Sequence, residues 1–386
     1  MLRKYAKKAL RHLAANTNYR PLNRIELDGD RMRGNVALIQ RQHPGFEVIP
    51  VLKGNAYGHG IEETAAILSK SNCRLLAVDG YFEAAKIRDI TGQHILVMGH
   101  IFPENVRLLD TKRCSFVVQD IAGLRAFGAL NKPVRVHVEL NTGMNRLGLQ
   151  PDELEAYLVA LKQYPKLQLE GVMTHLADAD NELDDSFNAR QLKIFDAQVA
   201  RILAAGFQPT IIHIAQTAGS TKIHSQYANA IRLGIGTYGI NPLLPHDRHY
   251  ADLKQLKPVM ELKSTVIKVL DLQRGDKVSY NCTFTAPKAM RVGVLPLGFY
   301  EGVPRELSDK GCVTYKNKEL PILGRVCMDH TVIDLDGTKL GVNDEVVVIS
   351  KDPVLPNSVV GLRTHHGLFP YTTLTGLSSS VRREVM

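Results

Sequence analysis

The stretch that decides the fold reads EVIPVLKGNAYGHG and runs from Glu47 to Gly60. It begins with a short apolar run, Glu47 to Leu52, whose length and branched side chains are typical of a buried β-strand. Lys53 follows directly and opens a glycine-rich loop, where a missing side chain leaves room for a ligand to approach the backbone. The stretch therefore predicts a strand that delivers a lysine to one edge of a buried sheet.

The same pattern continues outward along the chain between about residues 48 and 235. Short runs rich in Val, Ile and Leu alternate with helical stretches, as expected for βα units around a buried parallel sheet. Further strands are predicted at Arg74 to Val78, His94 to Met98, Ser115 to Gln119, Val134 to Leu140, Leu169 to Thr174, Thr210 to Ala215 and Ala230 to Leu233. Helices are predicted at Gly60 to Ser69, Phe82 to Asp89, Ile121 to Leu130, Pro151 to Gln163 and Asn181 to Ala205. Eight strands is the number that closes a (β/α)8 barrel of the TIM type.

After about residue 245 the pattern changes to short Val/Thr/Lys alternations separated by turn residues, which predict antiparallel strands. These lie at Glu261 to Leu270, Arg291 to Pro296, Cys312 to Tyr315, Thr331 to Leu335 and Glu345 to Ile349. We therefore expect an α/β protein with a barrel at residues 23–245 and a mainly antiparallel β domain at residues 246–386. A strand near residues 23–28 is open to pairing with that second domain.

Composition agrees with two folded domains in 386 residues, of which 44% are apolar. No apolar run approaches the roughly 18–20 residues that a membrane-spanning helix needs. The five cysteines are odd in number and scattered without metal-type spacing. We therefore expect a reduced, cytoplasmic protein without a transmembrane segment.

Part of the net charge of +9 comes from a basic extension at residues 1–22. Its apolar residues recur at helical spacing. Three interpretations of this pattern are a helix on a membrane surface, an organelle presequence and a nucleic-acid-binding segment. A solvated helix is the simpler interpretation, and we expect no nucleic-acid partner.

The ends of the predicted strands carry a polar set of residues, and barrel enzymes place their working groups at these ends. A lysine such as Lys53 can serve as the amine of a Schiff base, although a solvated lysine is the plainer alternative. The loops after strands seven and eight are the recurrent phosphate site of barrels. Here they offer the Thr217 hydroxyl and backbone N–H groups near Gly234 and Ile235. Arg232 could face a ring nitrogen, a carboxylate or a salt-bridge partner.

Two other readings are weaker. Gly234 to Gly239 matches the G-x-G-x-x-G dinucleotide fingerprint, but no βαβ unit follows it. His175 is followed by several aspartates, which suit either a metal site or an acidic loop that starts a helix. We expect no metal.

The sequence resembles the alanine racemase family, whose cofactor-lysine motif is matched by VLKGNAYGHG at Val51 to Gly60. The further matching motifs, in order, are Asn141 to Gly148, Thr174-His175 with Asp180, Arg232 to Gly239, Val278 to Tyr280, Gly324 to Asp329, and Pro370-Tyr371. They cover roughly residues 23 to 383. The resemblance implies a pyridoxal 5'-phosphate enzyme, an isomerase, that interconverts L-alanine and D-alanine and supplies D-alanine for the bacterial cell wall.

The resemblance also implies a head-to-tail homodimer and a two-base mechanism on the cofactor aldimine. Lys53 would hold the cofactor and handle the D-enantiomer, while Tyr280 from the partner's β domain would handle the L-enantiomer. The phosphate would be held by Tyr57, Thr217, Gly234, Ile235 and Tyr371. Arg232 would donate to the pyridine nitrogen, with His175 against the ring. Arg146 and the Met328 backbone N–H would bind the substrate carboxylate, with Asp329 beside them.

Three departures from the family pattern concern the site. Glu139 stands where many members have a carbamylated lysine, Gln216-Thr217 replaces Asn-Ser, and Phe299 replaces a tyrosine. They leave the amino-acid preference open, so a racemase of broader preference, for example for serine, is one alternative. A related decarboxylase and a non-catalytic pyridoxal-phosphate-binding protein are the others.

Overall fold

The computed structural model describes residues 20–181 and 183–386, which divide into two compact units. The barrel unit contains residues 27–260, 351–377 and 385–386. The β unit contains the described residues up to Glu26 together with residues 261–350 and 378–384. Residues 1–19 of the predicted basic extension lie outside the residues that the structure describes. The domain boundaries expected at residues 22 and 245 remain a prediction.

The barrel unit is built on a parallel eight-stranded sheet in the order β2-β9-β8-β7-β6-β5-β4-β3. Its strands are β2 (Glu47–Pro50), β3 (Leu75–Val78), β4 (His94–Val97), β5 (Cys114–Val118), β6 (Val134–Glu139), β7 (Leu167–Met173), β8 (Ile211–Ala215) and β9 (Ala230–Leu233). A parallel bridge between Val51 and Ala77 joins the two ends of this order, so the sheet closes on itself.

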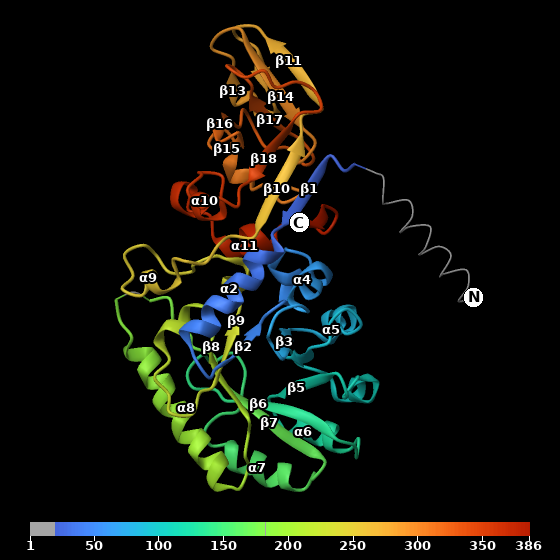
Figure 1. The fold of residues 1–386 in the computed structure, drawn as a ribbon, viewed down its shortest axis with the longest axis vertical. Coiled ribbons are helices and arrows are strands. Elements are labelled where there is room, and N and C mark those ends of the chain that lie inside the picture. Colours follow the sequence, from blue (N-terminus) through green and yellow to red (C-terminus); the bar gives the residue numbers. More distant parts are fainter. Residues whose placement is uncertain (1–19, 182) are drawn as a thin grey trace, which may run out of the picture. The chain divides into compact units, whose positions relative to one another are not determined.

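Helices lie outside this ring of strands (Figure 1). They are α2 (Gly29–Gln42), α4 (Ile61–Leu68), α5 (Tyr81–Ile87), α6 (Ile121–Gly128), α7 (Leu154–Lys162), α8 (Ser186–Ala204), α9 (Tyr250–Leu253), α10 (Val359–His366) and α11 (Pro370–Thr375). The remaining helical segments of this unit are α3 (Lys53–Tyr57), η1 (Pro103–Leu108), η2 (Ala218–Lys222) and η3 (Ile235–Tyr238). In the described residues, no helix combines the length and the apolar character needed to cross a membrane.

Apolar side chains from every strand but β6 fill part of the barrel interior. Ile49, Leu75, Leu96, Val117 and Ile211 belong to one buried cluster, and all are at most 5% exposed. Because side chains alternate along a strand, the residues two positions further on also face inward and lead toward the carboxyl ends. The packed interior therefore fixes the strand ends that carry the polar groups.

The β unit consists of mainly antiparallel sheets. The largest has the order β16-β15-β18-β10-β1-β19, and the others are β11-β14-β17 and β12-β13. The strands are β1 (Asn23–Leu27), β10 (Met260–Thr265), β11 (Lys268–Leu272), β12 (Lys277–Val278), β13 (Phe284–Thr285), β14 (Met290–Leu295), β15 (Cys312–Tyr315), β16 (Lys318–Pro321), β17 (Thr331–Asp334), β18 (Glu345–Ile349) and β19 (Arg382–Val385). Two short turns of helix are η4 (Tyr280–Cys282) and η5 (Arg305–Leu307).

The predicted fold class, a barrel followed by a mainly antiparallel β region, is confirmed. All eight predicted barrel strands are present, with ends that shift by up to two residues. The single strand expected at Glu261 to Leu270 is wrong, because two strands, β10 and β11, occupy that region. They belong to different sheets. The residues between them, Val266 and Ile267, bond to backbone outside both strands, which ends the regular pairing.

Candidate active site

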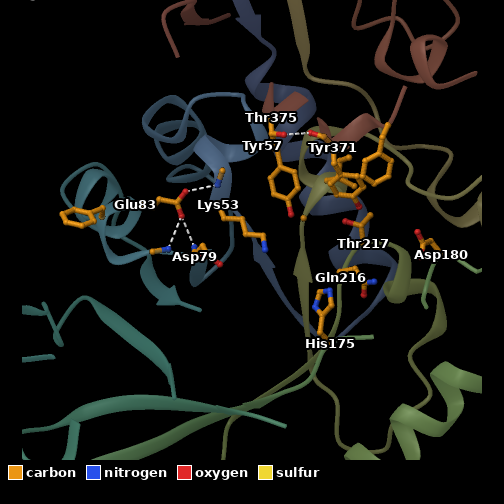
Figure 2. Close-up of a pocket in the computed structure, with 16 residues that line it drawn as sticks. Lys53, Tyr57, Asp79, Glu83, His175, Asp180, Gln216, Thr217, Tyr371 and Thr375 are labelled. Carbon is orange, nitrogen blue, oxygen red and sulfur yellow. Dashed lines mark hydrogen bonds between the residues drawn. The ribbon is translucent and has the colours of Figure 1, made fainter. Parts of the chain in front are cut away.

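A cavity of about 730 Å³ opens at the carboxyl ends of the barrel strands. Figure 2 shows the Lys53 side chain pointing into it between Tyr57 and His175. A second cavity of about 350 Å³ shares Lys53 with the first and adds Arg146 and Arg232 to its lining. Both volumes lie in the range usual for small-molecule sites. The cavities therefore gather the predicted barrel residues around one lysine.

The backbone after Lys53 adopts an unusual left-handed turn. Gly54, Asn55, Ala56 and Tyr57 all have φ between 51° and 64°. This conformation costs roughly 1–2 kcal/mol for each residue other than glycine, so other contacts must hold it. The Glu83 carboxylate accepts hydrogen bonds from the backbone N–H groups of Gly54 (2.8 Å) and Asp79 (3.0 Å) (Figure 2). Glu83 thereby ties the Lys53 turn to the neighbouring strand end.

A group of hydroxyls and small residues lies at the other end of the cavity. Thr217 Oγ1 accepts a hydrogen bond from the Gly236 N–H at 3.0 Å, which leaves its own proton free to donate. A Cβ atom on Gly234 would lie 2.8 Å from the Tyr57 hydroxyl, so glycine keeps this space open. Burial raises the pKa of Tyr57 and raises the pKa of Tyr371 to about 12, so both phenols stay protonated donors near neutral pH.

Arg232 is the most constrained cation of the site and is only 3% exposed. Its Nη atoms donate to the backbone carbonyls of Thr174 (2.7 Å), His213 (2.9 Å) and Ile214 (3.0 Å). They also donate to the ring nitrogens of His213 (3.0 Å) and His175 (3.1 Å). Within the described residues, the Nε–H has no acceptor. The guanidinium is thus fixed by five neutral acceptors and retains one N–H at the cavity wall.

His175 is neutral in this setting. Burial, followed by the charges of Arg232 and Arg146, lowers its pKa to about 3. Because an arginine can only donate, Nδ1 of His175 must be the acceptor of the Arg232 contact. The ring proton therefore sits on Nε2, which makes Nε2–H a hydrogen-bond donor.

Arg146 lines the smaller cavity from a loop after β6, where its side chain is exposed. Asn141 shapes the loop by accepting hydrogen bonds from the backbone of Gly143 (3.1 Å) and Asn145 (3.0 Å). Glu139, at the end of β6, is 6% exposed and accepts a hydrogen bond from Gln119 at 3.1 Å. Burial raises the pKa of Glu139, while Arg232, Arg146 and Lys53 oppose that rise.

The remaining predicted residues belong to the β unit. Tyr280 is 69% exposed and stands on a turn in which Ser279, Asn281 and Cys282 all have positive φ. The Ser279 hydroxyl fixes this turn by donating to the Arg325 carbonyl at 2.7 Å. The tyrosine ring thus projects from a rigid turn without being packed in its own unit.

Met328 stands on a second exposed turn of the β unit. The turn is closed by a hydrogen bond from the Cys327 N–H to the His330 carbonyl at 2.9 Å. Tyr300 donates its N–H to the Met328 carbonyl at 3.0 Å, whereas the Met328 N–H has no acceptor in the part of the chain that the structure describes. Asp329 is exposed beside it. The turn therefore offers one free backbone donor.

The aspartates that follow His175 were one candidate for a metal site. Across residues 20–181 and 183–386, no three His, Cys, Asp or Glu side chains are grouped to hold a metal ion. The aspartates after His175 instead bond within their own loop or to a lysine: Asp178 accepts from Asn181, Asp184 from Ser186, and Asp185 pairs with Lys222.

Sequence reasoning missed several residues of the site. Glu83, Asp79 and Gln119 were not singled out, nor were the two histidines behind Arg232, which are His213 and His137. The signal for Glu83 was present as a glycine followed three residues later by glutamate at a helix start. The signal for the histidines was a polar residue at inward positions of strands expected to be fully buried.

Comparisons with known proteins agree with this geometry. The chain matches the family described as alanine racemase, N-terminal domain, over residues 27–242, and alanine racemase, C-terminal domain, over residues 259–385. It is 31% identical over 370 residues to alanine racemase of Geobacter sulfurreducens, covering 93% of this chain and 95% of that one.

Two solved structures have the same fold. Alanine racemase of Bacillus anthracis, solved with bound L-Ala-P, is 28% identical with a TM-score of 0.86 and coverage of 96% of each chain. Alanine racemase of Bartonella henselae, solved with covalently bound pyridoxal phosphate, is 23% identical with a TM-score of 0.80, covering 95% of this chain and all of that one. At 23% identity that second likeness concerns the fold alone. The resemblance noted in the sequence is confirmed.

Proposed function

The chain belongs to the alanine racemase family, and we propose that it interconverts L-alanine and D-alanine with Lys53 and Tyr280 as its two bases. Enzymes of this family are pyridoxal-phosphate-dependent isomerases. The observation that carries the proposal is the Arg232 guanidinium, which is fixed by five neutral acceptors and keeps one N–H at a cavity that also contains Lys53.

The cavity fits pyridoxal phosphate in three respects. The Gln216 Oε1 atom is buried and has no hydrogen-bond partner in the described residues. Buried polar atoms normally have a partner, so a bound ligand would satisfy this one. Gly234 leaves the space that a side chain would fill. The hydroxyls of Tyr57, Thr217 and Tyr371, with the backbone at Gly234 and Ile235, form a set of neutral donors suited to a phosphate. These groups would hold the phosphate.

Arg232 would donate its Nε–H to the pyridine nitrogen. A guanidinium cannot give up its proton readily, so it donates a hydrogen bond without protonating its partner. Even with its pKa lowered by burial to about 10, Arg232 remains charged near neutral pH. His175 would lie against the ring and offer its Nε2–H toward Tyr280. The cofactor would supply an electron sink for the negative charge that forms at the α-carbon of the substrate.

Racemisation requires one group on each face of the α-carbon, one to remove a proton and one to return it. Lys53 would serve the face on which the D-enantiomer carries its α-proton. Tyr280 would serve the opposite face and remove the proton from the L-enantiomer. A tyrosine and a lysine differ in charge in both protonation states, so the two directions of the reaction begin from different forms of the site.

The substrate carboxylate would be bound by Arg146 and by the Met328 N–H, with Asp329 beside them. Tyr280 and Met328 are 69% and 56% exposed, which is unusual for groups that act on a buried substrate. This exposure supports a head-to-tail homodimer in which the β unit of one protomer completes the partner's site. The five cysteines, all free, are consistent with a cytoplasmic location, where such an enzyme would supply D-alanine for the cell wall.

A chiral assay of the purified protein with added pyridoxal phosphate tests the proposal. We expect D-alanine to appear from L-alanine faster than the D-enantiomers appear from L-serine or L-lysine. The Lys53→Ala protein is the control and should give none. A faster reaction with serine or lysine would reassign the substrate, release of carbon dioxide would indicate a decarboxylase, and cofactor binding without turnover would refute the enzymatic role.

A further inference from the structure

A chain of hydrogen bonds leads from Arg232 into the interior of the barrel. Arg232 Nη1 contacts His213 Nδ1 at 3.0 Å, His213 Nε2 contacts His137 Nδ1 at 2.9 Å, and His137 Nε2 contacts Glu170 Oε2 at 3.1 Å. The four residues come from β9, β8, β6 and β7, which are neighbouring strands of the barrel. The chain therefore links the cavity wall to a carboxylate that does not line it.

The hydrogen bonds of this chain can be donated in only one direction, from Arg232 toward Glu170. Arg232 is solely a donor, so His213 must accept at Nδ1 and carry its proton on Nε2. His137 must then accept at Nδ1 and carry its own proton on Nε2. Glu170, when ionised, is solely an acceptor and receives that proton. Both ends thus require the same tautomer of each histidine.

The two histidines are held in place by packing. His137 and His213 are 0% exposed, and their rings meet edge to face at an interplanar angle of 84°. A Cβ atom on Gly171, which is paired with His137 across the strands, would lie 2.1 Å from His137 Nδ1. The missing side chain at residue 171 makes the room for the imidazole.

Glu170, at the far end of the hydrogen-bond chain, stays ionised. Besides His137, Glu170 accepts a hydrogen bond from the Ser115 hydroxyl and lies 3.8 Å from Arg135. Together these contacts outweigh burial and lower the pKa of Glu170 to about 2. All five acceptors that touch Arg232 are neutral, so this carboxylate is the anion to which the guanidinium is joined by hydrogen bonds.

We propose that Glu170 is a positioning residue for Arg232, acting through His137 and His213. An anion at the end of a hydrogen-bond chain polarises each link, which makes His213 Nδ1 a stronger acceptor and holds the guanidinium in one orientation. The Nε–H is then aimed at the cavity before any ligand arrives. The role given to this orientation of the Nε–H rests on the proposed function, because it presumes that the ring nitrogen of the cofactor lies opposite Nε.

The first test reads the tautomers directly in the holoenzyme. Long-range ¹⁵N–¹H spectra of histidine side chains, assigned with the His137→Gln and His213→Gln variants, should show both residues as neutral rings protonated on Nε2. A proton on Nδ1 of either ring, or a charged imidazolium at neutral pH, would overturn the chain. This readout is independent of racemisation, so it stands even if the proposed function fails.

The second test removes the charge while keeping the shape. Glu170→Gln retains an acceptor oxygen, and Glu47→Gln is the matched control because Glu47 is also a strand carboxylate, bonded to Arg74 rather than to the site. We expect Glu170→Gln to lower kcat roughly tenfold, the size seen when an outer hydrogen-bond partner is lost at metal sites. KM for L-alanine should change less. The ¹⁵N shifts of His137 and His213 should move, and the cofactor should bind more weakly.

The outcomes separate the two proposals. A fall in kcat with shifted histidine signals, absent from Glu47→Gln, supports the positioning role. Unchanged kcat and unchanged cofactor affinity in folded Glu170→Gln would overturn it. If Glu170→Gln does not fold, Gly171→Ala provides a second perturbation, because its methyl group displaces the His137 ring without altering a charge; an unaltered kcat in that variant would equally refute the role. Racemisation absent from the unmodified protein would instead refute the proposed function.

Discussion

The mouth of the barrel and the exposed turns of the β unit present their functional groups in opposite ways. At the barrel mouth, Arg232 is 3% exposed and held by five hydrogen bonds. In the β unit, Tyr280 is 69% exposed, and its backbone turn is fixed by Ser279 while its ring has no such surroundings. The barrel unit holds its polar groups in fixed positions around a cavity, whereas the β unit exposes its tyrosine on a braced turn.

Under the proposed function, this difference indicates which groups the barrel unit positions by itself and which would need a second surface in order to act. Buried polar groups with fixed partners are preorganised and need no rearrangement to act. An exposed tyrosine is solvated, and its chemistry changes once a second surface covers it. Cofactor binding should therefore depend on the barrel unit alone, whereas proton transfer should depend on both regions.

The largest effect is expected at Lys53. Lys53→Ala removes both the attachment point of the cofactor and one base, so turnover should fall by roughly 10³-fold or more. Borohydride reduction followed by peptide mass spectrometry should find no cofactor adduct, while exposed Lys254→Ala should behave as the unmodified protein does. An adduct on another lysine would remove Lys53 from its assigned role.

The next effect separates the two regions. Tyr280→Phe should lower racemisation of L-alanine by roughly 10²-fold or more, because a phenyl ring cannot carry the proton. Cofactor affinity, measured by absorbance titration, should stay unchanged. Tyr315→Phe, another tyrosine of the β unit, is the control. Equal loss of cofactor binding in Tyr280→Phe would contradict the division of labour between the regions.

Acid should weaken the barrel unit before the β unit. Burial lowers the pKa of His94 to about 4 and of His175 to about 3, and it also lowers those of His137 and His213. Below the ordinary histidine pKa of about 6.5, the unfolded chain gains protons that these folded residues cannot take. The free energy of unfolding should therefore fall as the pH drops below about 6.5, by roughly 1 kcal/mol per pH unit for each residue that stays unprotonated in the folded chain.

The described β unit has one histidine, the exposed His330. Its Glu345 has a pKa lowered to about 2, mainly by the Arg24 hydrogen bond. The stability that this lowered pKa contributes to the β unit is fully present above the unfolded pKa near 4.5, and it disappears only as the pH falls toward 2. Hydrogen exchange in urea at pH 7.5 and 5.5 should show faster opening of barrel peptides only. Equal acceleration in both units would refute the assignment to the buried histidines.

A smaller effect is expected from Gly234→Ala. The new methyl group would lie 2.8 Å from the Tyr57 hydroxyl and displace it, which should weaken cofactor binding about tenfold, or roughly 1–2 kcal/mol. Gly34→Ala is the control, since a Cβ there meets nothing within 4 Å. Undiminished affinity in Gly234→Ala would show that this end of the cavity does not hold the cofactor.

The smallest effect is expected from Thr217→Ser, at a position that departs from the family pattern. Thr217→Ser keeps the hydroxyl and removes only a methyl group, so cofactor affinity should stay within about twofold of that of the unmodified chain. Thr217→Val removes the hydroxyl and should weaken binding about tenfold. Absorbance titrations of the two variants with pyridoxal phosphate, run side by side, measure this difference in affinity. Similar affinities would mean that the hydroxyl does not contact the ligand.

Much of this architecture could be predicted because it depends on local pattern. Runs such as Val134 to Leu140 are recognisable as buried strands, and eight of them imply a closed barrel. Residues at the strand ends, such as Lys53 and Thr217, could then be singled out by position alone. The break between β10 and β11 could not, because Val266 and Ile267 are as apolar as strand residues and only their backbone partners end the strand.

The sequence by itself determined the order of the strands, the residues that emerge at the barrel mouth and the family to which they belong. It did so because hydrophobic periodicity and motif spacing are properties of neighbouring residues. Only the tertiary structure decided the left-handed turn braced by Glu83 and the chain from Arg232 through His213 and His137 to Glu170. These depend on side chains from different strands meeting in a closed barrel, where burial fixes which nitrogen holds each proton.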